Sequence, residues 1–232
     1  SDLKKLVNRV KEAKEKNEKP SIAFHGNIID VWKTFYENNI YIDIGSDQTS
    51  LHNPYSGGYY PVDVSFKKSN EMIKKNPSEF KKLVQKSLRI HVNYINKHTK
   101  KGTYFFDYGN AFLLESSRAK AKILNEKKEF KYPSYVQDIM GPLCFDYGFG
   151  PFRWICASNK KSDLEKTDNI ATKVLEKIIK SSSKNIKQQL EDNLQWIKSA
   201  KKNKLVVGSQ SRILYANSEG RIKIALAFNK AI

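Results

Sequence analysis

The sequence predicts an α/β fold with a parallel sheet, on two observations from the first half of the chain. Short apolar runs alternate there with segments that repeat apolar residues at helical spacing. In addition, an apolar run, a Gly-Asn pair and a helical segment follow one another twice, at Gly26-Asn27 and at Gly109-Asn110. Strands that alternate with helices are typical of parallel sheets, because a parallel strand pair needs a long crossover connection. The 232 residues are enough to bury a substantial core.

Each element of the first half follows from local pattern. Apolar spacings of three and four predict helices, short apolar runs beside Gly, Pro or Asn predict strands, and a stretch rich in Gly, Pro and Tyr predicts an ordered loop. The expected elements are a helix from residue 3 that ends before Pro20, a strand at 21–24, a helix from 28, a strand at 40–44, a turn at 45–50, a loop at 51–61, helices at 65–75 and 77–98, a strand at 103–106 and a helix at 111–124.

The second half has a different character. Residues 148–154 form a rigid segment in which Gly and Pro alternate with aromatic residues around a single Arg. The elements expected after it are helices at 170–180 and 186–201 with a serine hinge at 181–183 between them, strands at 204–207 and 213–215 with a turn at 208–210, and a closing helix or strand from 221.

Three polar segments follow strands of the predicted parallel sheet: Asn27, residues 48–52 and Tyr108. Ligands of such sheets bind outside the carboxyl ends of the strands, so these segments are expected to converge on one crevice. Each alone has a structural interpretation, since Asn is a favoured helix cap and Gly a turn residue. Convergence at three consecutive strand ends favours a functional site.

Arg153 stands among aromatic residues in the second half. A guanidinium has a planar fork that matches the two oxygens of a carboxylate, and apolar surroundings strengthen that contact. The alternative is a packing role, with the guanidinium stacked on Trp154 or Phe152.

The charge suggests a second class of function. The chain has 42 Lys and Arg against 24 Asp and Glu, a formal charge of +18, which would ordinarily indicate a nucleic-acid partner. However, six of the basic residues are Arg, whereas base recognition and bidentate phosphate contacts favour Arg over Lys. The lysines are dispersed and interleaved with Glu, so we interpret them as a solvated surface and keep a basic nucleic-acid-binding module as the alternative.

Other classes of site and location have no support in the sequence. The four His and two Cys show no metal-ligand spacing, so no metal site is expected. There is neither a membrane-spanning apolar stretch nor a signal peptide, which makes the cytoplasm the default. No Gly-x-Gly-x-x-Gly is present. Either the fold does not bind a dinucleotide, or a Gly-rich turn precedes Ser1, and the missing initiator Met favours the second explanation.

Several segments together resemble the urocanate hydratase (urocanase) family, in particular its animal-like branch. They hold the family's order and spacing over nearly the whole chain, and comprise Gly26-Asn27, residues 47–54, Gly58 to Pro61, Asp107 to Asn110, Gly148 to Trp154, and Gly208 to Ile213. The resemblance implies a hydro-lyase of histidine degradation that adds water to urocanate, giving 4-imidazolone-5-propanoate, with tightly held NAD⁺ as an electrophile. It also implies a cytoplasmic homodimer with neither a nucleic-acid nor a membrane partner.

The resemblance assigns roles to individual residues. Arg153 matches the family position that binds the substrate carboxylate. The positions that match NAD contacts are Asn27, Ile28, Gln48, Thr49, Ser50, Leu51, His52, Tyr59, Tyr60 and Tyr108. Many bacterial members have an active-site cysteine where this chain has Leu214, so no catalytic residue is assigned.

The resemblance also implies a domain organisation. Residues 1–140 are expected to be the C-terminal part of a Rossmann-like NAD-binding domain with a parallel sheet, and residues 141–232 part of an α/β core domain. The chain is then expected to be an internal piece of a longer protein, and by itself it could be inactive. An inactive paralogue that keeps the fold is a further alternative.

Overall fold

The computed structural model describes residues 2–48, 51–109, 111–200, 202–203 and 210–231. The chain divides into two compact units, Ser1–Ile139 and Met140–Ile232. Both combine helices with a small sheet, so the predicted α/β class is confirmed.

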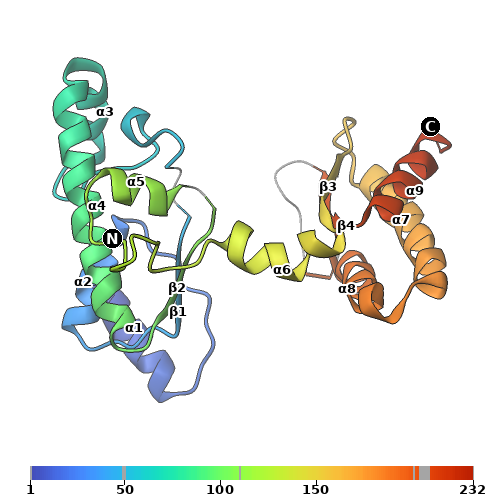
Figure 1. Ribbon diagram of the computed structural model, residues 1–232, viewed down its shortest axis with the longest axis horizontal. Coiled ribbons are helices and arrows are strands. Elements are labelled where there is room, and N and C mark those ends of the chain that lie inside the picture. The colour runs from blue at the N-terminus through green and yellow to red at the C-terminus, as the bar shows by residue number, and fades with distance from the viewer. Residues whose placement is uncertain (1, 49–50, 110, 201, 204–209, 232) are drawn as a thin grey trace. The chain divides into compact units, whose positions relative to one another are not determined.

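The first unit is built around a parallel pair of strands, as predicted (Figure 1). Its described elements are α1 (Leu3–Glu15), α2 (Ile28–Glu37), β1 (Ile44–Asp47), the 3₁₀ turn η1 (Pro54–Ser56), α3 (Phe66–Lys75), α4 (Pro77–Thr99), β2 (Tyr104–Asp107) and α5 (Phe112–Arg118), followed by the π-helical turn η2 (Tyr135–Met140). The register pairs Ile44 with Tyr104 at one end and Asp47 with Asp107 at the other.

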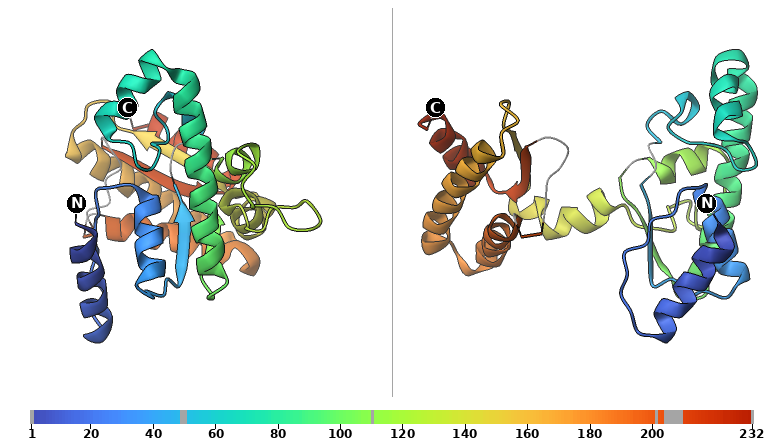
Figure 2. Two further views of the ribbon diagram at one scale, coloured as in Figure 1. Left: turned by 90° about the vertical axis from the view of Figure 1, so that its left-hand side faces the viewer. Right: turned by 180° about the vertical axis from the view of Figure 1, so that it is seen from behind.

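The core of this unit lies between the two strands and helices α2 and α4. These two helices run beside the sheet (Figures 1 and 2). Helix α4 presents a fully buried stripe at spacings of three and four, with Phe80, Val84, Leu88, Val92 and Ile95 all 0% exposed. This stripe is why the prediction of α4 from apolar spacing is confirmed nearly to the residue.

Helix α2 packs closely on the sheet through Trp32. The indole lies 6.0 Å from the Phe105 ring, centroid to centroid, in an edge-on arrangement. A Cβ at Gly45 would meet the Trp32 ring at 2.5 Å, so only glycine permits this approach.

The strand predicted at residues 21–24 is wrong: these residues are described and form no strand. Ile22 is exposed, and no described strand pairs with this run. Such a short run gains no ladder hydrogen bonds without a partner.

Strand β1 begins at Ile44, later than the predicted start at residue 40. Ile40 belongs to the end of α2 instead: Asn39 has a φ of 52°, and the Ile40 N–H donates to the Phe35 carbonyl at 2.9 Å. Ile40 follows the left-handed residue that ends the helix, a position where apolar residues often pack back on the helix. It is therefore buried without being part of the sheet.

Helix α5 is shorter than the predicted 111–124, because Lys120 ends it in the left-handed conformation with φ 60°. The Ala121 N–H donates back to the Ser116 carbonyl at 2.9 Å, and the Lys120 N–H donates to the Ser117 carbonyl at 2.8 Å. Glycine is the usual residue at a left-handed helix terminus, so the lysine at position 120 does not indicate from the sequence that the helix ends there.

The second unit packs an antiparallel strand pair against helices. Its longer elements are β3 (Gly150–Ile155), α7 (Lys161–Ser181), α8 (Lys184–Ala200), β4 (Ser211–Ala216) and α9 (Ser218–Asn229), with the short helical turns α6 (Gly141–Leu143) and η3 (Phe145–Tyr147) before them. The rigid 148–154 segment thus becomes a strand, α7 starts earlier than predicted, and the closing element is a helix. The predicted strand at 204–207 and most of the turn after it lie outside the described residues.

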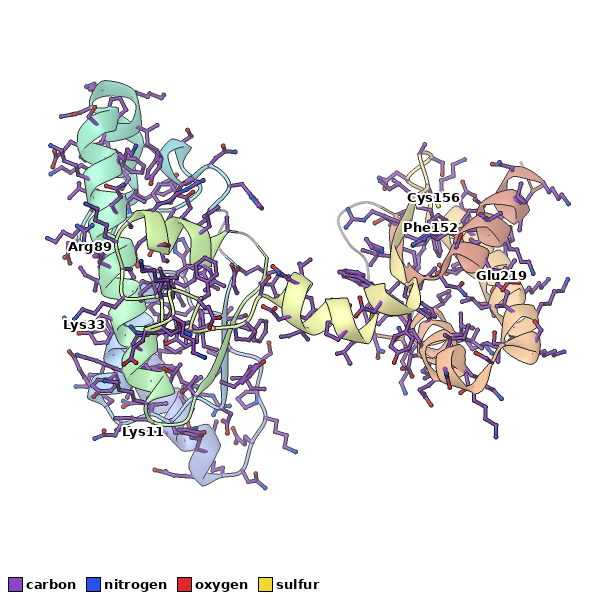
Figure 3. All side chains as sticks on the ribbon, in the orientation of Figure 1. Lys11, Lys33, Arg89, Phe152, Cys156 and Glu219 are labelled. Carbon is purple, nitrogen blue, oxygen red and sulfur yellow. The ribbon has the colours of Figure 1, made fainter. Side chains whose placement is uncertain are left out.

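Many of the described lysines lie on helix surfaces, in agreement with the interpretation of the charge pattern; Lys11 on α1 and Lys33 on α2 are exposed examples (Figure 3). Among the described helices, none is both long and apolar enough to cross a bilayer.

Candidate functional site

Two of the three predicted polar segments start side by side at the carboxyl edge of the parallel sheet. Asp47 and Asp107 are register partners at the ends of β1 and β2, and the Tyr108 N–H donates to the Asp47 carbonyl at 3.3 Å. Gln48 and Tyr108, which follow directly, are both exposed. Thr49 and Ser50 lie outside the described residues. The third segment, at Asn27, does not follow a strand.

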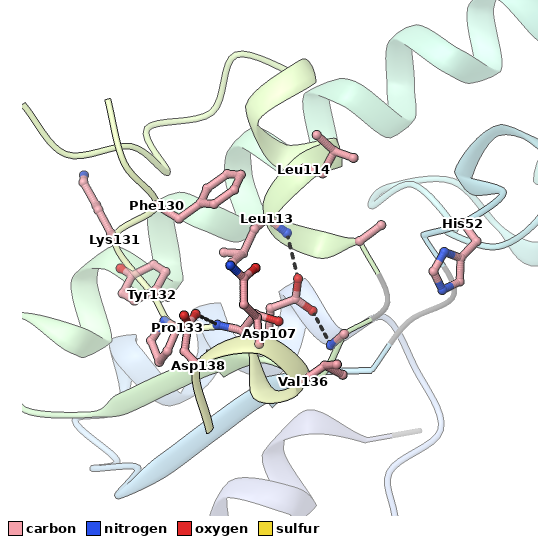
Figure 4. A pocket seen from close by; sticks show the side chains of 14 residues that line it. His52, Asp107, Leu113, Leu114, Phe130, Lys131, Tyr132, Pro133, Val136 and Asp138 are labelled. Carbon is pink, nitrogen blue, oxygen red and sulfur yellow. Dashed lines mark hydrogen bonds between the residues drawn. The ribbon is translucent and has the colours of Figure 1, made fainter. Parts of the chain in front are cut away.

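A cavity of about 870 Å³ opens beside the end of β2 (Figure 4). One wall comes from residues 107–114 and the other from residues 130–138, and the His52 side chain lines it as well. His52 is the one predicted site residue among the described lining. Residues 130–138 were not predicted, because they have neither helical nor strand periodicity.

Asp107 shapes the turn between the sheet and the cavity. Its carboxylate accepts hydrogen bonds from the Gly109 N–H at 2.9 Å and the Leu113 N–H at 3.2 Å (Figure 4). It therefore caps the start of α5 and fixes the path of residues 108–113. Gly109 has a φ of +96°, and a Cβ there would meet Cγ2 of Val136, which also lines the cavity, at 2.6 Å.

Replacing Gly109 by Ala is expected to lower the free energy of unfolding by about 2–4 kcal/mol, because left-handed backbone strain adds to the clash with Val136. Gly57→Ala is the matched control: Gly57 has a φ of +97°, but its Cβ would meet ordinary contacts at 3.6 Å and beyond. The control is expected to lose about 1–2 kcal/mol, from strain alone. Equal losses in urea titrations of the two variants would contradict a clash at the cavity wall.

Asn27 is a helix cap, as its structural interpretation predicted, and it also binds the loop of residues 51–62. Its Oδ1 accepts from the Ile29 N–H at 3.0 Å, and its Nδ2 donates to the Tyr60 carbonyl at 3.1 Å. The Tyr60 hydroxyl in turn donates a hydrogen bond to Asn70 Oδ1 at 2.9 Å. The structure therefore brings two predicted site residues, Asn27 and Tyr60, into contact, while Ile28 beside them is partly exposed.

Two predicted site residues have their side chains in the core. Leu51 is 1% and Tyr59 3% exposed. The Tyr59 hydroxyl lies 3.1 Å from His91 Nδ1, and the two rings stack. Among the described residues of the predicted set, the side chains that are accessible at this edge are those of Gln48, His52 and Tyr108. The Tyr108 ring stacks on Tyr135 at an interplanar angle of 4°, which creates a flat aromatic surface.

Burial lowers the pKa of His91 from its ordinary value of 6.5 to about 3. Well above pH 6.5 the imidazole is neutral in both the folded and unfolded states, so it adds no pH dependence there. As the pH falls from 6.5 toward 3, the unfolded chain binds a proton that the folded chain does not, and stability is lost.

Between pH 7 and pH 5.5 this difference is expected to cost about 1 kcal/mol of unfolding free energy. A His91→Asn variant, which cannot titrate, is expected to lose about 1 kcal/mol less over that interval than the unsubstituted protein. His98, whose pKa burial also lowers, is kept in both proteins and cancels. Parallel urea titrations at the two pH values test this; an equal loss in both proteins would mean that His91 is not buried neutral.

Arg153 lies in the second unit, on the exposed face of the strand pair. Phe152 and Trp154, its neighbours along β3, face the other side and are more buried. The Trp154 indole donates to Thr167 at 3.0 Å, and its ring packs on Phe228. Because successive residues of a strand face opposite sides, the predicted alternative of Arg153 stacked on these two rings is wrong. Among the described residues, no carboxylate pairs with the Arg153 guanidinium.

The opposite face of the same sheet holds Leu214 and Arg212. Leu214 pairs with Phe152 and is 2% exposed. Arg212, to which the sequence motifs assigned no role, donates two hydrogen bonds to the Asp168 carboxylate, from Nε to Oδ1 at 3.1 Å and from Nη2 to Oδ2 at 2.7 Å. A side chain at position 214 therefore points into the interior of this unit, away from Arg153.

Comparison with known families decides what these two units are. Residues 1–139 match the family model of the urocanase Rossmann-like domain, and residues 142–232 match that of the urocanase C-terminal domain. The chain belongs to the urocanase family. The resemblance drawn from the sequence motifs is thereby confirmed, and the nucleic-acid-binding alternative receives no support.

Similar proteins carry the name of one enzyme. The chain is 53% identical to a probable urocanate hydratase of Dictyostelium discoideum, 50% to one of Caenorhabditis elegans and 49% to the urocanate hydratase of Mus musculus. Each alignment covers 99% or 100% of this chain and 35% of the relative. This urocanase chain therefore spans about a third of the length of the relatives it matches.

Proposed function

We propose that the parent polypeptide, meaning the longest natural polypeptide that contains this chain, is a urocanate hydratase. It adds water to urocanate to give 4-imidazolone-5-propanoate, with NAD⁺ as resident cofactor. The observation that carries the proposal is that both units match urocanase domains, over almost the whole chain, and that the relatives named above bear this activity in their names. The geometry agrees, since polar side chains gather at the carboxyl edge of a parallel sheet.

The residues of the first unit fit a dinucleotide in two respects. The cavity of about 870 Å³ is within the range of cofactor sites. The exposed Tyr108 ring, which stacks on Tyr135, offers a flat surface on which a planar ring can stack. When bound, NAD⁺ supplies an electrophilic ring that withdraws electrons from the substrate.

The proposed cofactor site keeps the full set of matched positions. It consists of Asn27, Ile28, Gln48, Thr49, Ser50, Leu51, His52, Tyr59, Tyr60 and Tyr108. Within this set we assign direct side-chain contact to Gln48, His52 and Tyr108, which are accessible, and a supporting role to the buried Leu51 and Tyr59.

Arg153 is the proposed substrate anchor. Its guanidinium is exposed, has no carboxylate partner among the described residues, and stands beside apolar Pro151 and Ile155 on the same face of β3. Urocanate ends in a carboxylate, which a guanidinium holds with two parallel hydrogen bonds. Binding at this end orients the substrate. We assign no general acid or base.

The finer parts of the hypothesis rest on family membership. Residues 1–140 are proposed to form the C-terminal part of the NAD-binding domain and residues 141–232 part of the core domain. The parent polypeptide is proposed to act in histidine degradation in the cytoplasm as a homodimer, with neither nucleic acid nor membrane as a partner.

The test is the ultraviolet absorbance of urocanate, followed after addition of the purified parent polypeptide and NAD⁺. The proposal predicts a steady loss of absorbance that scales with enzyme concentration and stops when the cofactor is removed. No loss at any enzyme concentration would rule out the hydratase assignment and leave the inactive paralogue.

A further inference from the structure

We propose that His91 and Ser87 of helix α4 are positioning residues, which hold the loop of residues 51–62 and thereby set the affinity for the cofactor. The effect on cofactor affinity rests on the proposed function, whereas the anchoring of the loop rests on the contacts in the structure. Neither residue belongs to the set matched with NAD contacts.

The loop needs anchors, because it has little regular structure of its own. Its one regular element is the single 3₁₀ turn η1, and Gly57 takes a left-handed φ of +97°. Yet Leu51 and Tyr59, near its two ends, are almost fully buried. A segment of this kind keeps one conformation only if side chains outside it bind its polar groups.

The first anchor is the hydrogen bond between the Tyr59 hydroxyl and His91 Nδ1, at 3.1 Å. His91 is 0% exposed and its other ring nitrogen, Nε2, has no hydrogen-bond partner. Phe112 closes the other side of the imidazole edge-on, at 5.1 Å between centroids. Burial first, and then the charge of Asp47, raise the pKa of Tyr59 well above its ordinary value, so the hydroxyl keeps its proton. Each of the two groups would be left unsatisfied in the core without the other.

The second anchor lies one helical turn earlier. Ser87 is 1% exposed, and its Oγ accepts a hydrogen bond from the Val62 N–H at 3.0 Å. Residues four apart share a face of a helix, so Ser87 and His91 present one polar stripe to the loop within the otherwise apolar face of α4. Serine and histidine are not favoured in a buried helix face, which agrees with a role for their polar atoms.

The anchored loop is connected to the proposed cofactor site at both ends. His52, at its start, lines the cavity, and the carbonyl of Tyr60, next to Tyr59, accepts from Asn27. Phe112, which packs on His91, begins the helix whose N-terminus Asp107 caps. A loop that is already ordered before binding loses less conformational entropy when the ligand binds, so the anchors are expected to raise affinity without touching the ligand.

The experiment measures amide hydrogen exchange of the loop in the parent polypeptide without NAD⁺, and then the Kd for NAD⁺. His91→Phe removes the partner of Tyr59, and Tyr59→Phe removes a single oxygen, so it serves if His91→Phe does not fold. His91→Asn keeps an acceptor near the position of Nδ1. His98→Phe is the matched control: His98 is buried on the same helix, but its Nε2 bonds the Trp32 carbonyl at 2.9 Å, not the loop.

In both His91→Phe and Tyr59→Phe, exchange at residues 51–62 is expected to accelerate about tenfold and the Kd for NAD⁺ to rise by a similar factor. The double variant is expected to be no worse than either single one, because both remove the same bond. In His91→Asn, the loop exchange rate and the Kd for NAD⁺ are both expected to lie within about twofold of those of the unsubstituted protein. In His91→Phe at saturating NAD⁺, the KM for urocanate is expected to stay unchanged. The control leaves loop exchange as it was.

Unchanged loop exchange in both variants would overturn the anchoring by His91, and an unchanged exchange rate of the Val62 amide in Ser87→Ala would overturn the anchoring by Ser87. Faster exchange with an unchanged Kd would overturn its role in cofactor affinity. If the unsubstituted parent binds no NAD⁺, the proposed function and the cofactor part of this inference both fail, while the exchange comparison still decides whether His91 holds the loop.

Discussion

Replacing Arg153 by Lys is expected to raise the KM for urocanate about 10- to 100-fold, because an ammonium cannot supply the second parallel hydrogen bond to the carboxylate and such bonds contribute about 1.5–3 kcal/mol. The Kd for NAD⁺ is expected to stay the same, since the matched cofactor positions belong to the first unit and Arg153 to the second. Steady-state kinetics on urocanate, together with NAD⁺ titration, measure both quantities.

Arg221→Lys is the control for this substitution. Arg221 lies on α9 of the same unit, and its guanidinium donates to the Ala216 carbonyl at 3.1 Å. The same chemical change there is expected to shift the KM by less than about twofold. If Arg153→Lys also leaves the KM unchanged, Arg153 does not bind the substrate carboxylate.

Replacing Arg212 by Met is expected to lower the free energy of unfolding of the second unit by about 3–5 kcal/mol, because it leaves the Asp168 carboxylate uncompensated in a largely buried place. The side chains are 5% and 15% exposed, and two hydrogen bonds join them. Urea unfolding followed by the fluorescence of Trp154 and Trp196, the tryptophans of this unit, measures the loss.

Lys223→Met provides the comparison. Lys223 pairs with Glu219 on the surface of α9, where both side chains are about half exposed. Exposed pairs of this kind contribute about 0–1 kcal/mol, so this variant is expected to be nearly as stable as the unsubstituted protein. An equally small loss in Arg212→Met would mean that the Arg212–Asp168 pair is not a buried bridge.

Substitutions of these two arginines, which lie on one sheet, are therefore expected to change different quantities. Arg153→Lys is expected to change the KM and not stability, whereas Arg212→Met is expected to change stability first. The distinction follows from strand alternation, which places Arg153 on the exposed face of β3 and Arg212 on the buried face of β4.

Sequence pattern predicted those parts of the fold that apolar periodicity determines. Helix α4 was predicted closely because its stripe from Phe80 to Ile95 repeats at helical spacing and is wholly buried. The ends of the strands were harder to predict from the sequence, since an apolar residue such as Ile40 can be buried at a helix terminus as well as in a sheet. The end of α5 at Lys120 depends on a left-handed backbone conformation that a lysine does not reveal.

The candidate site shows the same division. The edge formed by Gln48 and Tyr108 was predictable, because the carboxyl ends of parallel strands meet at one edge. The second wall of the cavity, residues 130–138, was not, because it joins an irregular stretch to the start of the short π-helical turn η2, and neither has an apolar periodicity that a sequence reveals. His91 was also missed: a lone histidine on an apolar helix face carries no motif, and its contact with Tyr59 joins residues 32 positions apart.

We propose that the parent polypeptide adds water to urocanate without net oxidation or reduction. Mass spectrometry of substrate, product and cofactor after turnover in isotopically labelled water tests this proposal. The expected product is heavier than urocanate by one water and carries one labelled oxygen, with NAD⁺ recovered in full and no NADH formed. Urocanate recovered unchanged, or NADH formed in proportion to product, would rule out a hydration without net redox change.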